Sequence, residues 1–331
     1  MAILELREQG LYCQAGDFYV DPWEPVHRAL VTHAHSDHAS PGSDLYLTAA
    51  QGEPLLRQRL GPEASVQGLE YGATLSLSTA TVSFHPAGHI LGSGQVRIEV
   101  AGEVWVVSGD YKLAADRTCP PFEPLRCHTF VTESTFGLPI FRWPETAEVI
   151  AGIHAWWRAN REAGKTSVLY GWPLGKMQRV LAELDAAIGP IYAHGAVERV
   201  NRIYWASGIR LTETPAPSRD TKGALILAPP GCQGSPWMKR FGNASTALVS
   251  GWMRIRGTRR RRSLDRGFVL SDHADWPALL KAIDETGAET VWVTHGLRAP
   301  LVRWLQEHGR NAVEVPVRMA EEQPGVEEYG S

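Results

Sequence analysis

The segment 32–38, Thr-His-Ala-His-Ser-Asp-His, constrains this chain most, because it gathers three imidazoles and one carboxylate. The four residues before it, Arg-Ala-Leu-Val, predict a short buried strand, so the cluster falls on the turn where that strand ends. Residues two apart on an extended backbone point the same way, so His33 and His35 can hold one ion. Asp37 and His38 lie past the turn and can hold a second ion, since divalent metals bind neutral imidazole and carboxylate well.

Side chains of the same kinds recur at later strand ends. Predicted strands end near His89, Asp110, Glu133 and His295, and each of these residues lies beside a glycine or a serine. A lone histidine such as His89 is more often structural, and a turn or N-cap role fits Glu133 as well as a functional role does. Together with the first cluster, seven residues fit a two-metal site: His33, His35, Asp37, His38, His89, Asp110 and His295.

The pattern H-x-H-x-D-H at 33–38 resembles the signature of the metallo-β-lactamase fold, an αββα sandwich. In that family the remaining ligands come from loops much further along the chain. The resemblance implies that one ion is held by His33, His35 and His89, that the other is held by Asp37, His38 and His295, and that Asp110 bridges them. Two ions roughly 3.5–4 Å apart can share one hydroxide that attacks a phosphodiester.

The block 139–266 has a different character. Predicted strands alternate with predicted helices, as in the helix at 146–161 and the strand at 167–170. Alternation at this spacing predicts a small domain with a parallel sheet. Strands that end in histidine and are followed by a helix return from 267 onwards. We therefore expect a first domain formed by 1–138 and 267–331, with 139–266 inserted into it.

An α/β block between Glu133 and His273 resembles the β-CASP subfamily of nucleases, in which a cap domain is inserted into the metallo-β-lactamase fold. An E-S-T-[FY]-G-like motif precedes the insert in that subfamily and an S-x-H-x-D-like motif follows it, which residues 133–137 and 271–275 match. The resemblance implies that His273 is a general acid oriented by Glu133, and we count Asp37 with them as catalytic. It also implies that Asp21 supports the histidine loop, although a plain Asp-Pro turn explains Asp21 equally well.

Within that subfamily the chain looks most like the bacterial ligase-associated DNA exonucleases, over essentially its whole length. The matching motifs lie at 12–13, 16–18, 133–139, 250–253 and 266–276. The resemblance implies a metal-dependent DNA exonuclease in repair, which hydrolyses phosphodiester bonds through a two-metal-bound hydroxide. DNA, as single strands or duplex ends, would be its substrate, and a DNA ligase its functional partner. Zinc is the default cofactor for such His/Asp ligands, and manganese also suits oxygen-rich sites.

An arginine-rich segment lies shortly before His273. Its six arginines are Arg254, Arg256, Arg259, Arg260, Arg261 and Arg262. Charge runs of this kind are usually solvated loops. On a chain of net charge −3, a phosphate-binding rim is the better interpretation, and such contacts would give affinity without reading sequence.

Composition limits the class of protein. The 331 residues are 44% hydrophobic and 21% charged, which fits one large or two modest domains. No apolar run reaches the length of a bilayer span, and the start Met-Ala-Ile-Leu-Glu does not read as a signal peptide. The four cysteines form no C-x-x-C pair and indicate scattered thiols in a reducing compartment. We therefore expect a cytoplasmic protein with no membrane association.

Three other functions fit parts of the sequence. A β-CASP ribonuclease in RNA processing would carry an identical site, so only a comparison of substrates separates it from the DNA exonuclease. A small-molecule hydrolase, such as a lactonase or thioesterase, needs neither the insert nor Glu133 nor the arginine segment. A non-enzymatic nucleic-acid-binding protein with an inactive site usually lacks metal ligands, and none is missing here.

Overall fold

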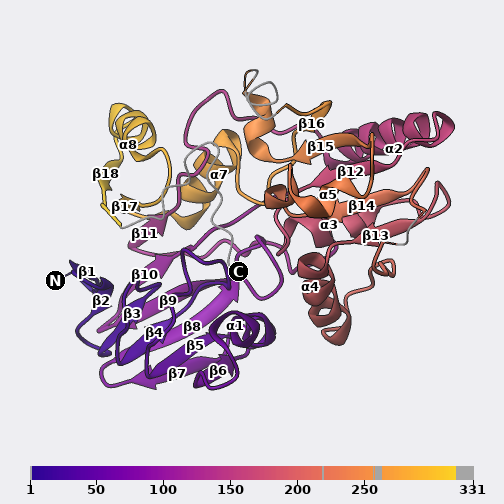
Figure 1. Cartoon of the computed structure of the whole chain (residues 1–331). Coiled ribbons are helices and arrows are strands. Elements are labelled where there is room, and N and C mark those ends of the chain that lie inside the picture. Colours follow the sequence, from indigo (N-terminus) through magenta and orange to yellow (C-terminus); the bar gives the residue numbers. More distant parts are fainter. Residues whose placement is uncertain (1, 218–219, 256, 258–262, 318–331) are drawn as a thin grey trace. The chain divides into compact units, whose positions relative to one another are not determined.

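The computed structural model describes residues 2–217, 220–255, 257 and 263–317. Within these residues the chain forms two compact units, one from 2–141 with 273–317 and the other from 142–272. Strands and helices are mixed in both units, which confirms the α/β class (Figure 1). The chain leaves the first unit after Phe141 and returns to it at His273. The predicted boundaries fell slightly earlier, after residues 138 and 266.

The first unit contains two sheets. Six described strands form one sheet in spatial order: β1 (Glu5–Arg7), β2 (Gly10–Cys13), β3 (Phe18–Val20), β4 (Arg28–Leu30), β5 (Leu45–Ala49) and β6 (Val66–Leu69). Seven described strands form the other: β18 (Asn311–Glu314), β17 (Thr290–Val293), β11 (Thr129–Thr132), β10 (Glu103–Val107), β9 (Gly94–Val100), β8 (Ala80–Pro86) and β7 (Thr74–Leu77).

The two sheets share one apolar core, and helices cover the other face of the seven-stranded sheet. Neighbouring residues of a strand point to opposite faces, so Val107 enters the core between the sheets while Val106 packs with α7 and α8. Helix α1 packs beside β6. The helices of this unit are η1 (Ala50–Gly52), α1 (Glu53–Leu60), α7 (Trp276–Thr286) and α8 (Arg298–Glu307).

Strand direction brings the predicted site residues to one edge. Strands β8 and β10 both run antiparallel to β9, and β11 and β17 run parallel to β10 and β11 in turn. The carboxyl ends of these four strands therefore lie at the same edge of the seven-stranded sheet. His89, Asp110, Glu133 and His295 each follow one of them, and the histidine cluster follows β4 of the facing sheet.

The second unit is built on a parallel sheet, as its alternating pattern predicted. Its described strands, in spatial order, are β13 (Ile191–Ala193), β14 (Leu225–Ala228), β12 (Ser167–Tyr170), β15 (Ser245–Val249) and β16 (Arg266–Phe268). Leu169 packs with α2 and α3 on one face, while Val168 packs on the α5 side. The helices of this unit are α2 (Thr146–Glu162), α3 (Lys176–Glu183), α4 (Gly195–Ala206), η2 (Pro230–Cys232), α5 (Pro236–Lys239) and η3 (Gly251–Arg254).

Strand β16 corrects one detail of the predicted division. We expected residues from 267 onwards to belong to the first domain, but β16 pairs in parallel with β15 and extends the sheet of the second unit. An apolar run predicts a strand, whereas the sheet that it joins depends on main-chain hydrogen bonds to a distant neighbour. The assignment of 139–266 as a cap domain stays a prediction.

No helix in the described ranges is both long enough and apolar enough to cross a membrane. All four cysteines are free thiols, as expected, and three of them, Cys13, Cys119 and Cys232, are buried.

Candidate active site

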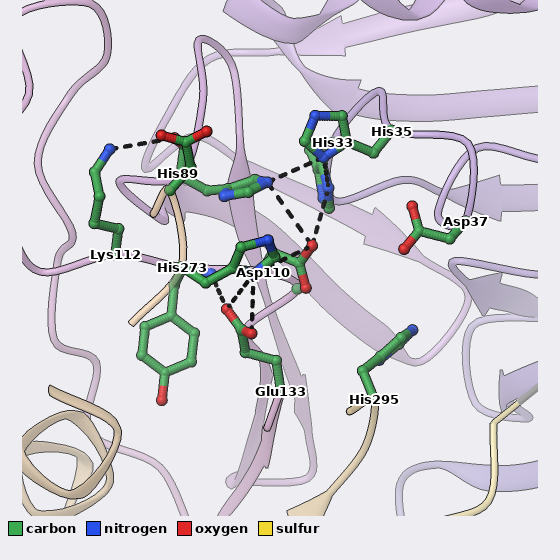
Figure 2. Close-up of polar contacts among 12 residues, drawn as sticks. His33, His35, Asp37, His89, Asp110, Lys112, Glu133, His273 and His295 are labelled. Atoms are coloured by element: carbon green, nitrogen blue, oxygen red, sulfur yellow. Dashed lines mark hydrogen bonds and ion pairs between the residues drawn. The ribbon is translucent and has the colours of Figure 1, made fainter. Parts of the chain in front are cut away.

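The first unit gathers the predicted metal ligands into a buried cluster. The side chains of His33, His38 and His89 have no solvent exposure, and that of Asp110 is 5% exposed. Figure 2 shows Asp110 in the middle of the group, with the imidazoles of His33 and His89 directed toward its carboxylate. These residues come from three separate strand ends, so the fold assembles the cluster from distant parts of the sequence.

Distances divide the cluster into two groups that share Asp110. Its Oδ2 lies 3.4 Å from Nε2 of His33, 3.5 Å from Nε2 of His38 and 3.8 Å from Nε2 of His89. Nδ1 of His35 lies 3.1 Å from Nε2 of both His33 and His89. The ligand atoms lie within 4.8 Å of one another in each of two groups, the first with His33, His35, His89 and Asp110 and the second with Asp37, His38 and Asp110.

The donor atoms suit a cation. Nε2 of His38 is buried and has no hydrogen-bond partner among the described residues. A buried polar atom without a partner is costly, and a metal ion bound to that nitrogen would remove the cost. Imidazole nitrogens and carboxylate oxygens are also the ligands that zinc and manganese accept. The residues present therefore fit one or more divalent ions.

Electrostatics within the cluster follow from burial and from the mixture of charges. Burial alone would raise the pKa of Asp110, but the neighbouring His38 and His273, together with the hydrogen bond of His33, hold it well below its usual value. Burial alone would lower the pKa of His38, but the carboxylates of Asp110, Asp37 and Asp21 raise it well above the usual value. The site therefore keeps its central carboxylate ionised.

His89 and His295 are held in the neutral form. Burial, with His273, His33 and His35 nearby, brings the pKa of His89 well below its usual value. Burial and the neighbouring His38 lower the pKa of His295 to about 4. Neutral imidazole is the form that binds a metal, so both rings are ready to act as ligands at neutral pH.

Asp21 contacts the histidine loop through its carboxylate. Its carboxylate accepts hydrogen bonds from the backbone nitrogen of Thr32 at 2.8 Å and from the Thr32 hydroxyl at 2.6 Å. Its Oδ2 also lies 2.7 Å from Nδ1 of His38, which leaves Nε2 of that ring to face Asp110. Contacts of this kind fix the orientation of a ligand ring. Thr32, which no pattern in the sequence singles out, links Asp21 to the cluster.

His295 lies beside the second group but not within it. Its ring stacks on that of His38, with the centroids 4.7 Å apart and the planes at 21°. Its backbone has a positive φ of 44°, and it lines a small cavity together with Asp37 and Asp21. The structure thus brings His295 to the site without placing its nitrogen in either ligand group of the described residues. Its role as a ligand stays a prediction.

Glu133 and His273 form a pair next to Asp110. Nδ1 of His273 lies 3.1 Å from Oε2 and 3.2 Å from Oε1 of Glu133. Glu133 also accepts a hydrogen bond from the backbone nitrogen of Tyr111 at 2.8 Å, so its carboxylate is fixed. The side chain of His273 is 15% exposed, more than those of His33, His38 and His89. The pair and Asp110 also form a third group of possible metal ligands.

A buried ion pair secures the loop that carries His89. Nζ of Lys112 lies 2.7 Å from Oδ2 of Asp116 and donates to the backbone carbonyl of His89 at 3.3 Å (Figure 2). The Cys119 thiol donates to the carbonyl of Gly88, and the Lys112 backbone nitrogen donates to the carbonyl of the residue before that glycine. Gly88 has a φ of 74°, and a Cβ there would come within 2.3 Å of the Lys112 carbonyl oxygen. The stretch after Asp110 therefore fixes the His89 loop.

Replacing Lys112 with methionine is expected to lower the free energy of unfolding by about 3–5 kcal/mol, because it removes a buried cation that lies 2.7 Å from the Asp116 carboxylate. Both side chains of this pair are at most 4% exposed. Urea denaturation followed by circular dichroism measures the change. The matched control is Lys281→Met, which breaks the pair with Glu285 at the same spacing but at 65% and 40% exposure. Equal effects of the two substitutions would contradict a structural role for Lys112.

The predicted nucleic-acid-binding arginines fall mostly outside the described residues. Arg254 ends η3 in the second unit and is exposed. Arg256 and the run at 259–262 are not described. Their predicted contact with phosphate therefore stays a prediction.

The chain is similar to parts of longer known proteins. No family model matches the chain. The chain is 31% identical over 311 residues to a protein named "Probable DNA ligase" from Opitutus terrae, and the match covers 92% of this chain and 30% of that protein. It is 30% identical over 152 residues to "Endoribonuclease ysh-1" of Neurospora crassa, which covers 44% of this chain and 17% of the relative. These relatives are thus much longer than the segments that this chain resembles.

A solved structure is similar over most of the chain. It is the crystal structure of a protein of unknown function from Enterococcus faecalis, and it superposes with a TM-score of 0.58 over 88% of this chain and 80% of that one. The two sequences are 12% identical. At that identity the likeness concerns the fold alone.

Proposed function

We propose that this protein is a metal-dependent nuclease of the β-CASP type that degrades DNA from an end. The observation that carries the proposal is the arrangement around Asp110, where two groups of His and Asp ligands share one carboxylate and the Glu133–His273 pair lies beside it. Similarity to a protein named as a DNA ligase and to proteins named as endoribonucleases supports a substrate that is a nucleic acid.

The proposed metal ligands all belong to the first unit and form two sets. We assign His33, His35 and His89 to one ion and Asp37, His38 and His295 to the other, with Asp110 shared. Zinc is the expected metal and manganese the alternative. Bound divalent ions supply Lewis-acid stabilisation of charge on a phosphodiester and lower the pKa of water. Asp21 keeps His38 oriented by its contact with Nδ1.

His273 is the proposed general acid. Glu133 accepts at Nδ1 of His273, and we assign Nε2 of the ring to the substrate. The oxygen that leaves a cleaved DNA backbone is a strongly basic alkoxide, and protonating it is worth roughly 10²–10⁴ in rate. The partial exposure of His273, beside fully enclosed histidines, supports a role at the substrate rather than within the metal cluster.

The choice of DNA over RNA rests on the relatives. A region like this chain forms part of a protein named as a DNA ligase, and that match covers far more of the chain than the matches to endoribonucleases do. For the same reason we infer that a DNA ligase is its functional partner. A ribonuclease with the same site is the second candidate, which the endoribonuclease names favour.

Digestion of matched DNA and RNA strands, labelled at either end, tests the proposal. Protein stripped of metal is supplied with Zn²⁺ or Mn²⁺, and the products are resolved by length. We expect stepwise shortening of DNA from one end, which also gives the polarity. Preferential loss of RNA would move the protein to the second candidate. Two bound ions with no cleavage of either strand would contradict a nuclease.

A further inference from the structure

A hollow of about 480 Å³ lies in the second unit where α4 begins next to α5. Sites for small molecules typically measure roughly 300–1,000 Å³, a range that accommodates a single nucleotide. No residue proposed for the metal centre is among its described lining residues. The polar and aromatic residues that line this hollow, here called the α4 hollow, are His194, Glu198, Arg199, Arg202, Trp237 and Arg240.

The α4 hollow carries an excess of positive charge. Three arginines line it, and all three are exposed. Glu198 is the one acid among the described lining residues, and it accepts a hydrogen bond from Thr214 at 2.7 Å while lying 3.5 Å from Nε of Arg202. Within the described part of the chain, Arg199 and Arg240 form no ion pair. On a chain of net charge −3, this is a locally positive surface.

The positive potential of the arginines converges on the start of α4. Nδ1 of His194 accepts a hydrogen bond from the Ala196 backbone nitrogen at 3.1 Å, so the neutral ring carries its proton on Nε2 as a donor. Burial lowers the pKa of His194, and the charges of Arg199 and Arg240 lower it further. The dipole of α4, which has 12 residues, adds its own attraction for anions at this end of the helix.

Aromatic rings lie against one of these arginines, Arg240. The ring of Trp237 meets that of His194 edge to face, with centroids 4.8 Å apart at 79°, and that of Phe241 with centroids 4.9 Å apart at 77°. The guanidinium of Arg240 lies 4.9 Å from the centroid of Trp237, which restrains its position. Proteins that bind single strands combine such rings, which stack on bases, with arginines that bind phosphates.

We propose that the α4 hollow binds one nucleotide of a single-stranded nucleic acid, with its phosphate on the arginines and its base against Trp237 and His194. A site for inorganic anions alone would not need the aromatic rings. The preference for a nucleic acid over another polyanion rests on the proposed nuclease function. The hollow gives the second unit a contact with the strand that is separate from the metal ligands and does not depend on base identity.

Binding of a labelled oligothymidylate to the full chain, stripped of metal so that no cleavage occurs, tests this site by fluorescence anisotropy. The double variant Arg199→Ala/Arg240→Ala is expected to weaken binding and to reduce the salt dependence by about 0.7 in log–log slope for each phosphate that the variant no longer neutralises. Arg158→Ala, an exposed arginine on α2 of the same unit, is the matched control and should bind as the parent does.

The base contact has its own test. Trp237→Ala is expected to weaken binding about 5- to 150-fold, the range for one stacked base, while Trp237→Phe retains most of the affinity. The phenylalanine variant is needed because Trp237 also packs partly against the core of the unit. Thermal melting verifies that the variants are folded. Unchanged affinity in folded Trp237→Ala would overturn the base contact.

The results of these binding experiments distinguish the proposed α4 hollow from the proposed nuclease activity. Parent affinity and salt dependence in Arg199→Ala/Arg240→Ala would overturn the α4 hollow even if the parent cleaves DNA. Binding that depends on these arginines would support the hollow even if the metal-loaded parent cleaves nothing, in which case the nuclease proposal fails alone. A parent that does not bind the strand at all would overturn the hollow.

Discussion

Replacing His273 with alanine is expected to slow cleavage of DNA by roughly 10²–10⁴-fold, the contribution of a positioned general acid, while the metal content stays unchanged. Glu133 lies 3.1 Å from Nδ1 of His273 and fixes the ring. Nδ1 of His273 is 3.9 Å from Oδ2 of Asp110, so the ring borders the metal cluster and remains partly exposed. Single-turnover kinetics and metal analysis of the purified variant measure the two quantities.

A change of leaving group identifies the role more sharply. A nitrophenyl ester of a nucleotide releases nitrophenolate, a much weaker base than a deoxyribose alkoxide, and so needs little help from an acid. We expect His273→Ala to lose far less activity on this ester than on DNA. Equal losses on both substrates would argue that His273 orients the substrate instead of protonating it.

An exposed histidine provides the control for His273→Ala, and the distances around His273 define the result that would contradict its role as an acid. His27 and Asp44 form an exposed His–carboxylate pair at 3.1 Å, with side chains 69% and 74% exposed, and His27→Ala should leave activity at the parent level. The ligand atoms of Asp110, Glu133 and His273 lie within 4.8 Å of one another. Loss of a metal ion in His273→Ala would therefore identify His273 as a ligand and would remove it as the acid.

Much of the fold could be predicted because short apolar runs determine where strands lie. The strand predicted at 167–170 coincides with β12, and the strand predicted to end near Glu133 is β11. Strand β9, Gly94–Val100, was not predicted as an element, although Arg97 and Glu99 alternate with apolar residues as in a half-buried strand. These two side chains form an ion pair at 2.7 Å and leave Val96 and Ile98 for the core. Membership of a sheet, as for β16, depends on partners far away in sequence.

Residues of the candidate site could be predicted where a histidine or a carboxylate follows the end of a predicted strand. Asp110 and the histidines follow strands whose carboxyl ends meet at one edge, which is a consequence of strand direction. Lys112 could not be recognised, because an i,i+4 pair with Asp116 looks the same in the sequence as the exposed pair of Lys281 and Glu285. Only the three-dimensional packing shows that one pair is buried below the His89 loop and the other is solvated.

Asp110→Asn is expected to have the second large effect, a loss of metal from both groups together with loss of cleavage. Oδ2 of Asp110 is the one carboxylate oxygen within 3.8 Å of Nε2 of His33, His38 and His89 alike among the described residues. Asparagine has nearly the same shape but no charge, so the side chain is retained while the shared anion is removed. Chelator competition measures the affinities, and metal analysis measures the number of ions bound.

Substitutions at two further carboxylates provide reference values for the loss of metal affinity in Asp110→Asn. Asp21→Asn removes the charge behind His38 and is expected to weaken metal binding by roughly 10–100-fold, as is typical of a residue that orients a ligand. The substitution suits that position because asparagine tolerates the positive φ of 43° found there. Asp44→Asn, at an exposed carboxylate, should change nothing. The loss in Asp110→Asn should exceed both, because Asp110 itself faces the ions. If Asp110→Asn bound two ions with the affinity of the parent, the arrangement in which both ions share the Asp110 carboxylate would be wrong. His273 would then lie beside a site formed by the histidines alone.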